Sequence, residues 1–262
     1  SADKKSIFVW SPFISKVGTV QNVINSINSI NKYSIHKTNI INVFGEWDNY
    51  KASFNLDKVS IYNFKFLRFL KFWNKIGFIK SRLSYLLIFL FSFFPLLNLI
   101  KKQKPDFLIV HLISSLPLTI FNLFNFKTKL ILHVAGHPKL NFLRKAIWKI
   151  SSKKIFKIIC PSQELKQVFL DYKIFSEEQI KVIEDPHLTI SNLNKLKNNV
   201  VNDNFFHESK VLIAIGRMTK QKNYSFLIKN FKKLTYKYKD IKLLIIGSGE
   251  EKNDLKNLIK EL

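Results

Sequence analysis

The chain has 262 residues, of which 47% are hydrophobic, so it is globular and large enough for one or two domains. Its single cysteine, Cys160, excludes an internal disulfide and any cysteine-based zinc site, and its place at the end of an apolar run predicts a buried thiol. The formal net charge of +25 favours anionic partners, namely nucleic acid, lipid headgroups or phosphorylated small molecules.

Short apolar runs alternate with longer amphipathic stretches, which predicts an α/β fold with a parallel sheet covered by helices. A loop, residues 11–18, follows the first strand, and Thr19 is the expected N-cap of the helix after it. Ser162 is the expected N-cap of a later helix, Gln163–Leu170. The expected strands are Ser6–Trp10, Asn39–Phe44, Val59–Tyr62, Asp106–His111, Lys129–Val134, Lys154–Cys160 and Ile180–Ile183.

A second strand–helix series begins after residue 210. Residues 190–204 are rich in Asn, Lys and Ser with little periodicity, which indicates a connection between domains. We expect two Rossmann-like domains, over residues 1–187 and 210–262, joined by a connection over 188–209. The second domain is expected to be incomplete, because one such unit is too small for a comfortable domain. Its expected elements are Val211–Ile215, Tyr224–Tyr236, Ile241–Ile246 and Glu251–Leu262.

The stretch Leu83–Ile100 contains no charged residue and has the threshold length of a membrane span. Pro95 interrupts it, and a span would separate strands that the alternating pattern places in one sheet. Three interpretations stay open, namely a helix buried against the sheet, a helix lying in the membrane interface, and a true span.

The strongest motif is VLIAIGRMTKQKN, residues 211–223. An apolar strand ends at Gly216, Arg217 follows, and Lys222 lies at the start of a helix. A guanidinium can bind two oxygens at once, an ammonium adds a point charge, and a helix N-terminus adds N–H donors, so the motif suits an anionic ligand. A second glycine turn, at Gly247, follows the next strand, and ligands of open α/β sheets bind at this carboxyl edge. An ordinary βα turn with solvated charges is the alternative.

This motif, followed by LLIIGSGEEKNDLKNLIKEL, resembles the donor-domain opening of family 4 glycosyltransferases, which have the GT-B fold. The resemblance implies that Arg217 and Lys222 bind the diphosphate of a nucleotide sugar, with Gly216 beside them. It is specific over residues 211–262, where strand, turn, charges, helix and second turn occur in the same order, and looser in the N-terminal part. A dehydrogenase fits less well, because no G-x-G-x-x-G follows the first strand.

The resemblance also assigns roles in the N-terminal part. Gly18 falls where the family has a glycine-rich loop that approaches donor phosphate, although many members have two adjacent glycines there. A histidine after the strand that matches KLILHV contacts the donor sugar in the family, so His133 is the expected catalytic residue and His137 the alternative. His111 closes the preceding strand, and Asp185 stands where the family usually has asparagine. A histidine in the core, or one that only supports a residue of the site, is the structural alternative for both His133 and His111, and an Asp-Pro turn is the alternative for Asp185.

Family 4 enzymes carry a Glu-x7-Glu motif further into the donor domain, and no such motif occurs before Leu262. The resemblance therefore implies that contacts to the donor's sugar and base are absent, and we expect the chain as given to lack turnover.

The predicted function is transfer of a sugar from a nucleotide-sugar donor to a cell-surface polysaccharide, lipopolysaccharide or lipid-linked acceptor, with retention of configuration implied by the family. No redox cofactor and no metal are expected. Ser1–Lys5 leads directly into a strand without a signal peptide, so a cytoplasmic location is expected, peripheral at the inner face of the membrane. The alternative is a non-catalytic basic protein that binds membrane or nucleic acid, although no nucleic-acid-binding motif accompanies the charge. The sugar, base, acceptor and oligomeric state stay open.

Overall fold

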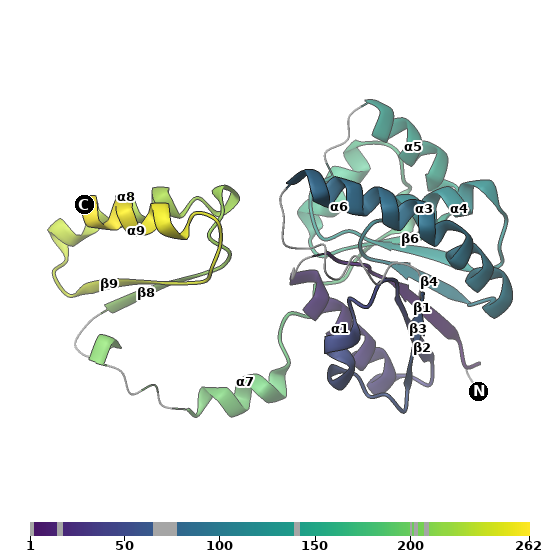
Figure 1. The fold of residues 1–262 in the computed structure, drawn as a ribbon, viewed down its shortest axis with the longest axis horizontal. Helices are drawn as coiled ribbons and strands as arrows, with labels where there is room; N and C mark the ends of the chain where they lie inside the picture. The colour runs from purple at the N-terminus through teal and green to yellow at the C-terminus, as the bar shows by residue number, and fades with distance from the viewer. Residues whose placement is uncertain are drawn as a thin grey trace. The chain divides into compact units, whose positions relative to one another are not determined.

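The seven apolar runs predicted as strands form one parallel sheet (Figure 1). Its order is β3-β2-β1-β4-β5-β6-β7, so the chain winds outward on one side and then returns to β4 beside β1. The carboxyl ends of β1 and β4 therefore form the switch point at which α/β sheets bind ligands. The strands are β1 (Ser6–Trp10), β2 (Lys37–Asn42), β3 (Val59–Asn63), β4 (Phe107–Val110), β5 (Lys129–His133), β6 (Ile155–Cys160) and β7 (Ile180–Val182).

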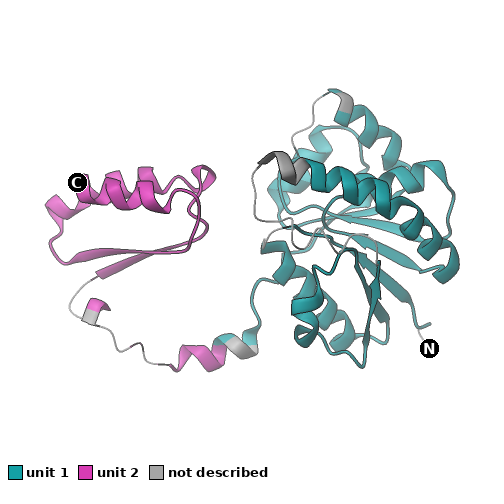
Figure 2. Ribbon diagram, in the orientation of Figure 1, with its two compact units in different colours: residues 1–193 teal, residues 194–262 magenta. Residues whose placement is uncertain are grey.

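The computed structural model describes residues 3–14, 18–64, 78–138, 142–199, 201, 204–206 and 210–262. The chain divides into unit 1, Ser1–Leu193, and unit 2, Asn194–Leu262 (Figure 2). This division falls inside the stretch 188–209 that the sequence predicts as a connection. Part of that stretch is helical, since α7 spans Ile190–Lys197 despite its weak apolar periodicity.

Two hydrophobic cores lie on the two faces of the sheet in unit 1. Successive side chains of a strand point to opposite faces, and in β1 Phe8 and Trp10 join one core while Val9 joins the other. Helix α1 (Gly18–Tyr33) packs on the Val9 side. The core on the other side includes residues of α3 (Phe78–Gln103), α4 (Ser115–Leu123) and α6 (Gln163–Asp171), with Trp148 of α5 (Phe142–Ser152) packed against it.

Helix α3 contains the uncharged stretch Leu83–Ile100 and has two different faces. Its C-terminal half packs into the core through residues that include Leu96 and Ile100, and it connects β3 to β4 of the same sheet. The segment Leu83–Gln103 is long and apolar enough to cross a membrane by composition, but a buried core helix passes the same test. Its other face carries exposed apolar side chains, at Leu83, Tyr85, Leu86, Leu90, Phe91 and Phe94. The structure therefore combines a buried helix with a face that remains open to solvent.

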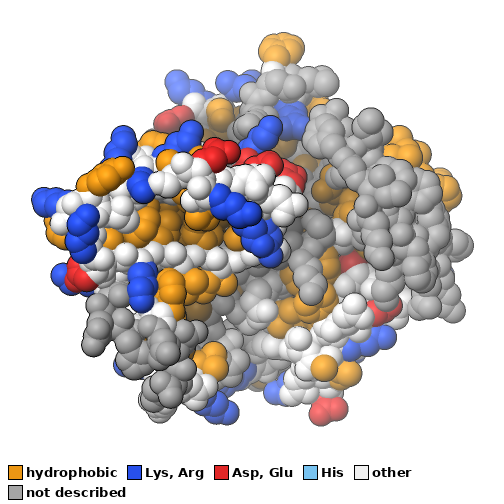
Figure 3. Space-filling model, turned by 60° about the vertical axis from the view of Figure 1, so that its left-hand side comes forward, with side chains coloured by type: hydrophobic (Ala, Val, Ile, Leu, Met, Phe, Trp, Pro, Cys, Tyr) orange, Lys and Arg blue, Asp and Glu red, His pale blue; other side chains and the backbone are white. Residues whose placement is uncertain are grey.

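Unit 2 contains the second predicted strand–helix series, as β8 (Lys210–Ile215), α8 (Tyr224–Lys237), β9 (Ile241–Ile246) and α9 (Lys252–Glu261). The two strands pair in parallel in register, and a small core forms beneath the helices from Met218, Tyr224, Ile228 and Leu255. Apolar side chains of β8 remain exposed, at Leu212, Ile213 and Ile215. In Figure 3, hydrophobic side chains lie at the near surface beside lysines and arginines.

Three local predictions have a clear outcome. Cys160 is fully buried, as its apolar run predicts. Ser162 caps α6, because its hydroxyl oxygen accepts a hydrogen bond from the Leu165 N–H at 3.3 Å. The prediction of Thr19 as an N-cap is wrong, because Gly18 is already helical in α1, and a cap residue lies outside the helical turn.

Candidate functional site

Three side chains from separate segments meet at the carboxyl edge of the unit 1 sheet. His133 ends β5, His111 follows β4, and Asp185 follows β7. The rings of His111 and His133 have centroids 4.5 Å apart and are tilted by 35°. Nε2 of His133 lies 3.1 Å from Oδ1 of Asp185, and the two side chains are 9% and 7% exposed. We call these three residues the His–His–Asp cluster.

Burial disfavours the protonated form of both imidazoles in the cluster. It lowers the pKa of His111 to about 3, with a smaller contribution from the neighbouring His133. Burial also lowers the pKa of His133, and it outweighs the opposing charge and hydrogen bonding of Asp185. A neutral imidazole has one donor and one acceptor nitrogen. If the Nε2 of His133 that faces the carboxylate carries the proton, its Nδ1 is left as an acceptor.

The buried Nδ1 atoms of His111 and His133, and Oδ1 of Asp185, have no hydrogen-bond partner among the described residues. Buried polar atoms without partners are rare in folded proteins and call for an explanation. An acceptor nitrogen at a ligand-binding edge is suited to a hydroxyl group of a ligand. The cluster can therefore orient a polyhydroxyl molecule without placing a positive charge beside it.

The segment after β7 is anchored so that Asp185 faces the histidines. The Asn25 side chain of α1 donates a hydrogen bond to the Pro186 carbonyl, and the Ile183 N–H bonds to Cys160 at the end of β6. The carboxylate of Asp185 also lies 3.9 Å from Nε2 of the exposed His187. A simple Asp-Pro turn, which the sequence offers as the alternative role of Asp185, therefore does not account for its contact with His133. His187 has no motif that would have marked it in advance.

Two other candidates in unit 1 lie apart from these contacts. His137 is an exposed residue of the loop after β5. Gly18 begins α1, and a Cβ at this position would meet no atom within 4 Å. The loop before Gly18, residues 15–17, lies outside the described residues, so the role of Gly18 stays a prediction.

In unit 2 the turns after β8 and β9 are packed backbone against backbone. A Cβ at Gly247 would lie 1.9 Å from the Gly216 carbonyl oxygen, and one at Gly249 would lie 2.1 Å from that of Met218. Hydrogen bonds join the two turns, from Gly216 N–H to Ile246 O at 3.0 Å and from Met218 N–H to Ser248 O at 2.9 Å. Only glycine fits at positions 247 and 249.

Arg217 and Lys222 project from the turn after β8 and are both exposed. The Lys222 side chain runs beside Gly216, because a Cβ there would lie 3.8 Å from its Cε. Asn223, in the left-handed conformation with φ 50°, then starts α8. The Gly216 N–H is already hydrogen-bonded within the sheet, so cationic side chains and the start of α8 are what this turn presents to an anion.

No group of three or more His, Cys, Asp or Glu residues is placed to hold a metal ion in the part of the chain that the structure describes.

Comparisons with known proteins bear first on the turn that carries Arg217 and Lys222. Residues 197–262 match the family model described as "Glycosyl transferases group 1". The chain is similar to glycosyltransferases. An uncharacterized glycosyltransferase of Methanocaldococcus jannaschii is 33% identical over 186 residues, covering 64% of this chain and 46% of the relative. The amylovoran biosynthesis glycosyltransferase AmsD of Erwinia amylovora is 28% identical over 186 residues, covering 66% and 48%. The chain thus spans about half the length of these curated relatives.

Solved structures show the fold. A variant of S. aureus TarM, in complex with fondaparinux, alpha-GlcNAc-glycerol and UDP, superposes with a TM-score of 0.63 at 13% identity, covering 98% of this chain and 75% of TarM. The UDP-GlcNAc 2-epimerase of Neisseria meningitidis, bound to UDP-GlcNAc, has a TM-score of 0.57 at 16% identity, covering 98% and 68%. The α/β architecture with two Rossmann-like units is that of the GT-B class, and this likeness concerns the fold alone.

Proposed function

We propose that the protein belongs to the retaining, family 4 type of glycosyltransferase and transfers a sugar from a nucleotide-diphosphate donor to a surface glycan or lipid-linked acceptor. The observation that carries the proposal is the family match over residues 197–262, because the matched segment includes the turn with Arg217 and Lys222. AmsD is named for amylovoran biosynthesis, which supports a surface polysaccharide as the kind of product.

In the proposed reaction an acceptor hydroxyl forms a bond to the anomeric carbon, and the bond from that carbon to the diphosphate oxygen breaks. The hydroxyl proton is lost and the nucleoside diphosphate leaves with the bonding electrons. Negative charge develops on the leaving diphosphate, and Arg217 and Lys222 stabilise it electrostatically. The transfer is redox-neutral, so we propose that it uses no redox cofactor, and these two cations supply the charge for which other sites use a metal ion.

The role proposed for unit 1 is to orient the donor sugar and to hold the acceptor. The neutral His133 accepts a hydrogen bond from a sugar hydroxyl through Nδ1, while Asp185 fixes its ring from the opposite nitrogen. A neutral imidazole suits this task, because its unprotonated nitrogen can accept a hydrogen bond from a hydroxyl group. Gly18 and His137 are proposed only as neighbours of the site.

Calorimetry with UDP, GDP and ADP tests the donor site directly. We expect nucleoside diphosphates to bind through their diphosphate, and Arg217→Ala to weaken that binding at least about 10-fold, because a charge-assisted hydrogen bond is lost. Lys149→Ala on α5 of unit 1 also removes one positive charge at an exposed position, and it is expected to leave nucleotide affinity unchanged. Absence of binding by all three nucleotides, or equal effects of the two substitutions, would refute the donor site. NMR of the product anomer tests retention in a preparation that turns over.

We also propose that unit 1 contacts the inner face of the cytoplasmic membrane through α3. The exposed apolar face of α3 would enter the bilayer interface, and the net charge of +25 would attract anionic headgroups. In co-sedimentation with phosphatidylglycerol vesicles, Leu90→Glu is expected to reduce the bound fraction. Leu56→Glu is the matched control, since Leu56 is 53% exposed against 55% for Leu90 and lies outside α3. Equal binding by both variants would contradict a contact through α3.

A non-catalytic basic binder remains the competing function. It predicts binding of DNA or vesicles that weakens steeply with salt, together with no affinity for nucleoside diphosphates. The calorimetry above therefore separates the two functions in one experiment.

A further inference from the structure

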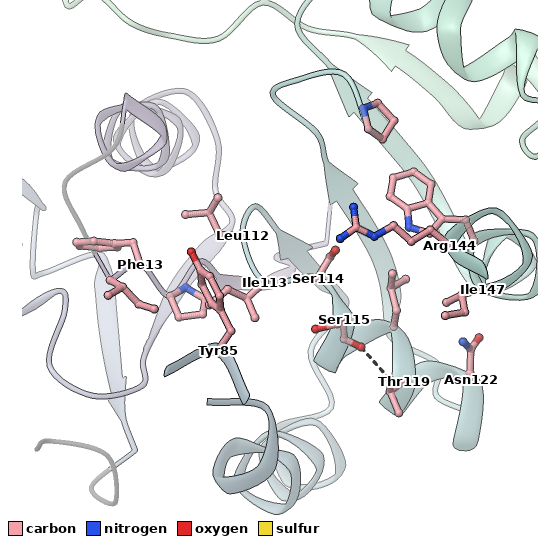
Figure 4. A pocket seen from close by; sticks show the side chains of 15 residues that line it. Phe13, Tyr85, Leu112, Ile113, Ser114, Ser115, Thr119, Asn122, Arg144 and Ile147 are labelled. Carbon is pink, nitrogen blue, oxygen red and sulfur yellow. Dashed lines mark hydrogen bonds between the residues drawn. The ribbon is translucent and has the colours of Figure 1, made fainter. Parts of the chain in front are cut away.

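A pocket of about 620 Å³ lies in unit 1 beside the His–His–Asp cluster but contains none of its three residues (Figure 4). Its walls come from the loops after β1 and β4 and from α3, α4 and α5. Leu112 and Ile113, which line it, directly follow His111 in the chain. The volume lies in the range of small-molecule sites, and the pocket occupies the switch point of the sheet.

The lining of this pocket is amphiphilic. Most of its wall is apolar, from residues such as Phe13, Leu118 and Ile147. Ser114 and Ser115 add hydroxyl groups where α4 begins, and Arg144 adds a guanidinium to the part of the lining that the structure describes. Figure 4 shows the guanidinium of Arg144 extending from α5 toward Ser114. Such a wall fits a hydrocarbon chain that carries an anionic group at one end.

The backbone at the pocket wall is strained, which is a second, independent observation. Ile113 has a φ of 49°, a conformation that β-branched residues rarely adopt. The indole N–H of Trp10 donates a hydrogen bond to the Ile113 carbonyl at 3.1 Å and so holds the loop in place. Strain of this kind concentrates at ligand sites, where surrounding structure maintains it.

The pocket is continuous with the exposed apolar face of α3. Tyr85 belongs to both, because it lines the pocket and its side chain also lies on the solvent-exposed side of the helix. The neighbouring Leu86 continues the exposed face. A hydrocarbon chain that leaves the pocket past Tyr85 therefore meets the exposed apolar side chains of α3.

We propose that this pocket binds the lipid phosphate of a lipid-linked acceptor, with Arg144 and the hydroxyls of Ser114 and Ser115 on the phosphate and the apolar wall on the chain. The inference rests on the proposed transferase function and names its acceptor class. Phosphates on an isoprenoid chain and on a glycerolipid share this chemistry, and the test separates them.

The experiment titrates the 262-residue chain with farnesyl phosphate below its micelle concentration and follows tryptophan fluorescence, since Trp148 lines the pocket. We expect saturable binding, weaker binding of farnesol and none of inorganic phosphate. Dioctanoyl phosphatidate replaces farnesyl phosphate in a second arm, and the tighter ligand identifies the source of the phosphate. Failure of both lipid phosphates to bind, or equal affinities for farnesol and farnesyl phosphate, would overturn the proposal.

Two substitutions on α5 locate the bound phosphate. Arg144→Ala is expected to weaken farnesyl phosphate binding about 10-fold or more and to leave farnesol binding unchanged. Lys149→Ala removes one charge from an exposed position of the same helix that does not line the pocket, and it is expected to change neither affinity. If the two substitutions weaken binding equally, the lipid phosphate is attracted by the overall positive charge of the protein, and the proposal of a specific site is overturned.

Nucleotide calorimetry on the same samples separates this inference from the proposed function. If UDP, GDP or ADP binds and no lipid phosphate binds, only the proposed acceptor pocket is refuted. If a lipid phosphate binds and no nucleotide binds, the proposed transferase function is refuted and the lipid phosphate site is retained.

Discussion

Oδ1 of Asp185 lies 3.1 Å from Nε2 of His133. The two residues are 52 positions apart in the chain, and they lie at the ends of strands that are not neighbours in the sheet. Their side chains are largely buried, so the carboxylate acts on the imidazole with little screening by water. This pair is the feature of unit 1 from which the first prediction follows.

Asp185→Asn is expected to lower the pKa of His133 further, because the carboxylate opposes the effect of burial. An asparagine oxygen can still accept a hydrogen bond, so the free energy of unfolding should change by less than about 1.5 kcal/mol. NMR titration of the histidine ring carbons measures the pKa, and Asp57→Asn at an exposed position is the control. An unchanged or higher pKa of His133 would contradict the pairing.

His111→Phe tests the buried histidine through the pH dependence of stability. The pKa of His111 is about 3 in the folded chain against an ordinary 6.5, so below pH 6.5 the unfolded state takes up a proton that the folded state does not. Stability due to His111 is complete above pH 6.5 and falls as the pH drops toward 3, by up to about 1.4 kcal/mol per pH unit. Urea unfolding at several pH values should show that the free energy of unfolding decreases less below pH 6.5 in the variant than in the parent. His187→Phe, at an exposed ring, should keep the slope of the parent.

Glu46→Gln is expected to have the opposite signature. Burial raises the pKa of Glu46 to about 7, although the N–H groups of Val43 and Phe44 donate to its carboxylate. Between pH 4.5 and 7 the folded state therefore holds a proton that the unfolded state has lost, and stability falls as the pH rises. Glutamine does not titrate, so the variant should lack this decline of at most about 1.4 kcal/mol per pH unit.

Tryptophan fluorescence is a suitable measure for both pH experiments, because all four tryptophans lie within residues 1–193 and report on unit 1. Glu178→Gln, at an exposed position, is the control for Glu46. A decline of the parent's magnitude in Glu46→Gln would show that Glu46 titrates normally.

Gly247→Ala is expected to disrupt unit 2, because its Cβ would lie 1.9 Å from the Gly216 carbonyl oxygen and the backbone must move. We expect a loss of more than about 2 kcal/mol in stability and loss of nucleotide binding. Gly136→Ala is the matched control, since a Cβ there meets no atom within 4 Å. Circular dichroism during thermal unfolding and nucleotide calorimetry measure the two effects. Equal tolerance of both substitutions would contradict the packing of the two turns.

The alternation of apolar runs was sufficient to predict the strands, because burial on both faces of a parallel sheet leaves a strong local signal. First and last strands in particular, such as Ser6–Trp10 and Ile241–Ile246, have the predicted bounds. The helical character of α7 was missed, since its apolar positions are few and no packing partner is visible in the local pattern.

The contacts within the site were harder to predict than the residues. His133 was identified from its place at a strand end, but its pairing with Asp185 depends on the order of strands, which no local pattern contains. The strain at Ile113 and the close approach at Gly247 likewise depend on tertiary packing. The ends of predicted strands thus indicate which residues can contribute to a site, and the order of the strands in the sheet determines which of these residues are in contact.

The two-stranded sheet of unit 2 has a practical consequence for handling the protein. Each of its strands is an edge, and exposed Leu212, Ile213 and Ile215 on β8 add apolar surface to unpaired backbone groups. Strands of this kind are templates for pairing with another chain. The 262-residue chain should therefore self-associate as its concentration rises, despite a net charge of +25 that opposes aggregation. Sedimentation velocity over a dilution series would reveal this association, and dilute samples suit the binding experiments above.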